Sequence, residues 1–125
     1  MAIIDASTHE LVNYTAYDMS GEGWKDSDVF EPHGLAVSPD GRWIYLPTGN
    51  GSKNGRFLII NAETMKLDKQ LALRPGGRPH HGKSFMDVDG NPRVLLYGWS
   101  QPPFVLDPND DNRVVGGVDF NEMSM

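Results

Sequence analysis

Residues 32–45 of the chain read Pro-His-Gly-Leu-Ala-Val-Ser-Pro-Asp-Gly-Arg-Trp-Ile-Tyr, and this stretch decides the predicted fold. Small and apolar residues over 34–38 predict a short strand. The Ser-Pro-Asp-Gly that follows favours a tight turn whose last residue, Gly41, adopts a left-handed conformation. A second strand is expected over 42–47. Its aromatic and aliphatic residues leave both faces apolar, which is typical of a sheet packed between two neighbours.

The same pattern returns further along the chain. Its landmarks recur in the same order after 46 to 49 residues, and a partial copy at the front of the chain is offset by 56 residues. The extra length of that offset falls in an insert over 19–31. The matched segments are 32–34 with 79–81, 40–41 with 89–90, 57–61 with 104–107, and 4–11 with 60–67. The chain is therefore predicted to be built from internal repeats.

Each repeat of about 47 residues holds four short segments with strand character, and no segment shows a sustained helical period. Four strands in a repeat of this length are typical of one blade of a β-propeller. The predicted fold class is all-β, with propeller blades that are four-stranded antiparallel sheets. We expect 1–125 to be a single propeller segment of ten strands, in which 1–18 forms the last two strands of a blade, and 32–73 and 79–118 each form a full blade.

The number of blades predicts an incomplete ring. A propeller closes with about four to eight blades, whereas this chain is expected to hold two and a half. Its first strands would offer unpaired edges, which favour pairing with another chain. We therefore expect either further copies of this chain, in a homo-oligomer, or a longer chain to complete the propeller.

Composition excludes several classes of partner. The net charge is −6, and the 11 basic residues are scattered, so no basic footprint for nucleic acid exists. No apolar stretch approaches the roughly 20 residues that cross a bilayer, so no membrane span is predicted. The start of the chain lacks the features of a signal peptide, and no export address is expected. The absence of cysteine excludes disulfides, thiolate metal sites and cysteine nucleophiles.

Three of the four histidines, His33, His80 and His81, fall at the repeated position that precedes the innermost strand of a blade. In a propeller this position faces the central channel, where side chains of successive blades converge. Neutral imidazoles without thiolates suit copper or zinc, with copper favoured. Because neighbouring residues of a strand point to opposite faces, His80 and His81 can both face the channel only if 79–82 forms a loop. Alternatively, Pro-His-Gly is simply a turn that leads into the strand, and its imidazole forms a hydrogen bond to a neighbouring blade.

No other motif predicts a catalytic or cofactor-binding residue. His9 is expected in a solvated turn, and Ser84 lacks the frame of a nucleophile elbow. The glycine-rich segment 49–55 is predicted to be a hairpin loop, because no helix follows it to bind phosphate. Arg78 and Lys83 either draw an anion towards the histidines or are simply solvated. Aromatic residues on the second strands are assigned to packing between blades rather than to substrate stacking: Trp43, Tyr45, Tyr97 and Trp99.

In segments 32–45 and 59–64, the chain resembles the repeat of seven-bladed propellers of the YVTN and lactonase-like superfamily. With Pro-His-Gly in one blade and Pro-His-His-Gly in the next, it is most similar to the copper-binding propellers of nitrous oxide reductase and thiocyanate dehydrogenase. This resemblance implies copper held by His33, His80 and His81, a small inorganic or sulfur- or nitrogen-containing substrate, and a periplasmic location. In those enzymes further blades supply more histidines. A weaker resemblance is to histidine-rich selenium-binding and methanethiol-oxidising propellers.

Two hypotheses for the function follow. In the first, the chain is a part or subunit of a copper-dependent oxidoreductase propeller, with its histidines binding copper at the central channel. In the second, it is a metal-free propeller fragment that acts as a binding or structural module and completes its ring by oligomerisation. The metal content of protein purified without added metal distinguishes the two.

Overall fold

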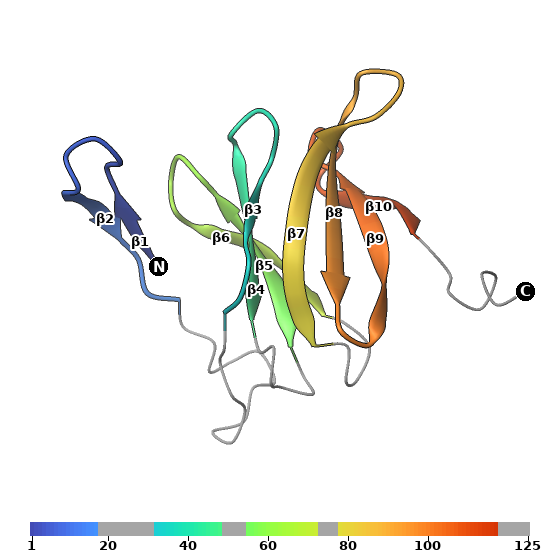
Figure 1. The fold of residues 1–125 in the computed structure, drawn as a ribbon, viewed down its shortest axis with the longest axis horizontal. Coiled ribbons are helices and arrows are strands. Elements are labelled where there is room, and N and C mark those ends of the chain that lie inside the picture. Colours follow the sequence, from blue (N-terminus) through green and yellow to red (C-terminus); the bar gives the residue numbers. More distant parts are fainter. Residues whose placement is uncertain (18–31, 49–54, 73–77, 118–125) are drawn as a thin grey trace, which may run out of the picture.

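The computed structural model describes residues 1–17, 32–48, 55–72 and 78–117. Within these ranges the protein is all-β, with ten strands in three antiparallel sheets (Figure 1). The predicted insert 19–31 and all but the last residue of segment 49–55 lie outside the described residues. In the part of the chain that is described, no helix is long and apolar enough to span a membrane.

The three sheets follow one another along the chain and stand side by side in Figure 1. Within each sheet, strands that are consecutive in sequence are also hydrogen-bonded neighbours. The first sheet contains β1 (Ala2–Ile4) and β2 (Leu11–Tyr14). The second contains β3 (Ala36–Val37), β4 (Trp43–Thr48), β5 (Arg56–Asn61) and β6 (Leu67–Ala72). The third contains β7 (Pro79–Met86), β8 (Pro92–Gly98), β9 (Gln101–Asp107) and β10 (Arg113–Gly117).

This architecture confirms the predicted fold class. Two of the sheets are four-stranded and antiparallel, as propeller blades are, and the three sheets of the described residues are fewer than the roughly four that a closed ring needs. Two strands differ most from their predicted boundaries. The strand expected over 34–38 is reduced to β3, and β7 begins at Pro79 rather than at Gly82. The division into blades at 1–18, 32–73 and 79–118 stays a prediction.

The Asp-Gly turns form as predicted. Gly41 has φ +77° and Gly90 has φ +79°, so both occupy the left-handed region that glycine adopts without a steric penalty. In each turn the glycine N–H donates to the carbonyl three residues earlier, at Ser38 and Asp87. The same type of turn therefore joins β3 to β4 and β7 to β8.

A second type of turn recurs and supports the alignment of the front segment 4–11 with segment 60–67. The Asp5 carboxylate accepts the backbone N–H groups of the second and third residues after it, and the Asn61 amide oxygen does the same. Each turn ends on a residue with positive φ, His9 at 59° and Met65 at 58°. His9 thus lies in an exposed turn, as predicted, and is equivalent to Met65.

The core consists of two apolar clusters, one on each side of the second sheet. One is formed by residues of the second and third sheets: Ala36, Tyr45, Phe57, Ile59, Val94, Leu96 and Leu106. The other joins the second sheet to the first, because Met1 and Ile3 pack against Ile44, Leu58, Ile60 and Met65. Both apolar faces that the sequence predicted for β4 are therefore covered, which confirms the prediction of a sheet packed between two neighbours.

Polar contacts fix the third sheet against the second. The buried Tyr45 hydroxyl donates to the Asn112 side-chain oxygen. Ser84, on β7, donates from its hydroxyl to the Val37 carbonyl on β3. At Gly82, an added Cβ would lie 2.9 Å from the Ala36 Cβ, so the two sheets approach closely there. These contacts hold β7 beside β3 and β4, and this junction carries the histidines.

Candidate metal centre

The three predicted histidines lie together at the junction of the second and third sheets. One ring nitrogen each of His33, His80 and His81 lies within 4.8 Å of the others. The His33 and His80 rings are stacked with centroids 3.9 Å apart, and the His81 ring meets them edge-on at 4.7 and 4.2 Å. Among the described residues this group contains imidazoles alone, so its potential metal ligands are all nitrogen.

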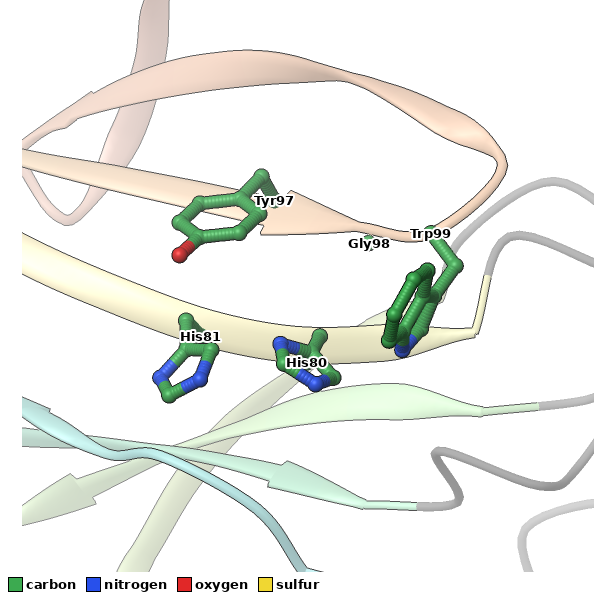
Figure 2. Close-up of a pocket in the computed structure, with 5 residues that line it drawn as sticks. All are labelled: His80, His81, Tyr97, Gly98 and Trp99. Carbon is green, nitrogen blue, oxygen red and sulfur yellow. The ribbon is translucent and has the colours of Figure 1, made fainter.

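A β-bulge brings the two neighbouring histidines to one side of the strand. In the pairing of β7 with β8, Pro79 is opposite Gly98 and His81 is opposite Tyr97, so His80 is an extra residue in the register. An extra residue interrupts the alternation of side chains and redirects one of them. Figure 2 shows both imidazoles projecting from the same side of β7. The prediction that this requires a loop is therefore wrong, because Pro79 and both histidines belong to β7.

Gly34 provides the space that the His81 imidazole occupies. A Cβ added at position 34 would lie 1.7 Å from Nδ1 and 2.3 Å from Cε1 of His81. Gly34 has no left-handed φ, so the need for glycine here is a close approach of a ring from the neighbouring sheet. The Pro-His-Gly motif therefore contributes both a histidine and the space for a second one.

The spacing of the nitrogens suits one metal ion. Imidazole nitrogens lie about 2.0–2.1 Å from a bound zinc ion, so the 3.1 Å between His33 Nδ1 and His81 Nε2 corresponds to about 100° at the metal. This angle lies between those of square-planar and tetrahedral sites. Two ligands of one ion can be at most about 4.1 Å apart. The cluster, which spans up to 4.8 Å, would close around an ion with side-chain movements below about 1 Å.

Without a metal, the same 3.1 Å contact is a hydrogen bond from one imidazole N–H to the other's lone pair. Partial burial, followed by the charges of His33 and His81, lowers the pKa of His80. A lowered pKa keeps the His80 imidazole neutral near pH 7, and only the neutral form can bind a metal. His80 is thus in a suitable protonation state to act as a metal ligand.

A pocket of about 360 Å³ opens beside the cluster, lined by His80, His81, Tyr97, Gly98 and Trp99 (Figure 2). Trp99 is 68% exposed, so its assignment to packing between blades is wrong. The assignment of Tyr97 stays a prediction, and Tyr45 and Trp43 do pack in the core. Tyr97 lies near the end of β8 and Trp99 directly follows that strand, which is paired with the histidine segment of β7. Their place opposite a Pro-His-His motif is the signal that could have revealed them.

The other residues considered for chemistry lie outside the histidine cluster. Ser84 is used in the hydrogen bond to β3, which fits its lack of a nucleophile motif. Arg78 and Lys83 are both exposed, and Arg78 adopts a left-handed φ of 47° directly before β7. The structure gives neither cation a place in the ligand set.

Comparison with known proteins supports the fold. Neither a protein-family model nor a curated protein sequence matches the chain. Among solved structures, the chain is similar to hydrazine synthase of Kuenenia stuttgartiensis, with a TM-score of 0.60 and 18% sequence identity. The match covers 93% of this chain and 28% of that one, so the chain spans less than a third of its structural neighbour. At this identity, the similarity extends to the fold alone.

Proposed function

We propose that His33, His80 and His81 bind copper, and that this chain contributes the site to a copper-dependent oxidoreductase propeller. The observation that carries the proposal is the convergence of three imidazoles, from two sheets, within 4.8 Å. An all-nitrogen set favours copper or zinc over magnesium and calcium, which take oxygen ligands. Copper(II) binds such a set more tightly than zinc does.

The residues around the cluster support a role in holding an ion. The bulge at His80 brings the two neighbouring imidazoles to one side of β7, and the space at Gly34 admits the His81 imidazole. Bound copper would supply one-electron redox chemistry. Three protein ligands leave coordination positions for a small substrate, and the inorganic or sulfur- or nitrogen-containing class remains part of this proposal.

Copper binding is tested by metal analysis of the purified chain before and after copper loading. The His80→Ala variant should lose bound copper and retain the β-sheet circular dichroism spectrum. The matched control is His9→Ala, because His9 is an exposed histidine in a turn that is separate from the cluster. Electron paramagnetic resonance should show nitrogen coupling to copper(II). A His80→Ala protein with the wild-type copper content would contradict the ligand assignment.

A metal-free binding or structural module is the competing proposal, favoured by the His33–His81 hydrogen bond, which holds the cluster together without an ion. If this alternative is correct, the purified chain should carry no metal, and copper should bind no more tightly to the wild type than to His80→Ala. Tight zinc binding without copper binding would support a metal site of a different kind.

We also propose that further sheets, from other copies or from a longer chain, complete the propeller. The outward-facing apolar side chains of the first sheet support this, because Leu11 and Tyr14 are 64% and 67% exposed. In the second sheet, by contrast, both faces are covered. Native mass spectrometry of the purified chain reports stoichiometry and bound metal together. A monomer that unfolds cooperatively would contradict the need for partners.

A further inference from the structure

We propose that the pocket beside His80 binds a small, uncharged aromatic molecule of one or two rings. Its volume of about 360 Å³ is at the lower end of the roughly 300–1,000 Å³ found for ligand pockets. Four of its five lining residues carry rings, and the fifth, Gly98, has no side chain to fill the space. The walls are protein side chains, so binding does not depend on a metal.

Trp99 presents a large apolar surface that the described residues leave mostly exposed. Its side chain is 68% exposed, although one edge contacts the His80 ring at a centroid distance of 4.9 Å. Figure 2 shows the indole extending from the end of β8 to a position beside His80. An exposed aromatic ring at the mouth of a pocket is a surface that a ligand ring can cover favourably.

The second wall is Tyr97, whose ring lies over that of His81 with centroids 5.8 Å apart and planes inclined by 29°. The two walls are not parallel, because His80 is inclined by 38° to Tyr97 and by 79° to Trp99. A planar ligand can therefore stack on one wall and meet the other edge-on. Both geometries are favourable between aromatic rings.

The lining also determines the charge of the ligand. Of the described residues that line the pocket, none carries a carboxylate, an ammonium or a guanidinium group. An ion placed there would lose hydration without gaining an opposite charge, and this is unfavourable. The lining side chains also carry groups that can form hydrogen bonds, namely the imidazole nitrogens, the Tyr97 hydroxyl and the Trp99 N–H, which suits a phenol or a nitrogen heterocycle.

The test uses metal-free protein in the presence of a chelator and follows the Trp99 indole N–H signal by nitrogen-15 NMR. The probes are indole and phenol, with cyclohexanol as the non-aromatic comparison and benzoate as the charged one. Indole should shift the Trp99 signal saturably and bind more tightly than cyclohexanol or benzoate. The Trp99→Ala variant, assayed by ligand-observed NMR, should bind indole about tenfold more weakly.

The matched control is Tyr14→Ala, because Tyr14 is equally exposed, at 67%, and lies on the first sheet. This variant should bind indole as the wild type does. Equal affinities for Trp99→Ala and Tyr14→Ala, or no saturable shift, would overturn the proposal, and tighter binding of benzoate would overturn the requirement for an uncharged ligand. Failure to bind copper leaves these results unaffected, so the two proposals are tested independently.

Discussion

Replacement of Gly34 by alanine adds one methyl group where the His81 imidazole packs against the chain. That carbon would lie 1.7 Å from His81 Nδ1, whereas ordinary contact begins at 3.4 Å. The imidazole must therefore withdraw by about 1.7 Å. Because the ring is the end of a side chain with rotatable bonds, we expect the ring to move and the backbone to stay in place.

A movement of this size removes His81 from the ligand set, since metal–ligand distances tolerate about 0.2 Å. Loss of a residue that only supports a ligand weakens metal binding by about 10–100-fold. Displacement of a ligand itself should weaken copper binding by about 100-fold or more. The free energy of unfolding should fall by only about 1 kcal/mol, through loss of the hydrogen bond between His33 and His81.

Copper affinity is measured by competition with a chelator of known affinity, and stability by urea unfolding. The matched control is Gly116→Ala, because an added Cβ there would meet only Val105, at an ordinary distance of 4.0 Å. The control should keep the wild-type copper affinity. Wild-type affinity in Gly34→Ala would refute the reasoning, and so would a loss of several kcal/mol of stability, because the backbone rather than the ring would then have moved.

Three further predictions concern stability, each measured by urea unfolding. Burial and the two neighbouring imidazoles lower the pKa of His80 in the folded protein. Its contribution to the free energy of unfolding is therefore fully present above the ordinary imidazole pKa of about 6.5, and it is lost as the pH falls through the lowered value. The midpoint should therefore drop between about pH 7.5 and pH 5 more in the wild type than in His80→Gln, and equal drops would contradict this. Gly41→Ala should lose about 1 kcal/mol, because φ is +77°; an unchanged midpoint would show that the turn adapts. Tyr45→Phe should lose about 1–3 kcal/mol, because the buried Asn112 loses its hydroxyl partner, whereas the exposed Tyr14→Phe should have little effect.

Local chemistry made much of the fold predictable. The turns at Gly41 and Gly90 depend on a residue that tolerates positive φ, and both form. The alternating apolar residues of β4 predicted a sheet covered on both faces, and both faces are covered. Strand ends were less predictable, since the start of β7 at Pro79 depends on pairing with β8 rather than on its own sequence.

The candidate site was predictable in its residues but not in its geometry. The repeat singled out His33, His80 and His81, because corresponding positions of neighbouring blades lie close in space. The bulge that redirects His80 arises from the register with β8, which the sequence does not reveal. For the same reason Trp99 was assigned to packing, whereas it is an exposed wall of the pocket.

The sequence by itself determined the elements that depend on neighbours along the chain: the strands, the Asp-Gly turns, the repeat and the candidate ligands. The tertiary structure alone decided that the His33 and His81 nitrogens, 48 residues apart in sequence, lie 3.1 Å from each other. It also decided that position 34 needs glycine, because the His81 imidazole of the neighbouring sheet occupies the space that a side chain would fill. Such contacts depend on register and packing between sheets, which sum over many residues and leave no local pattern.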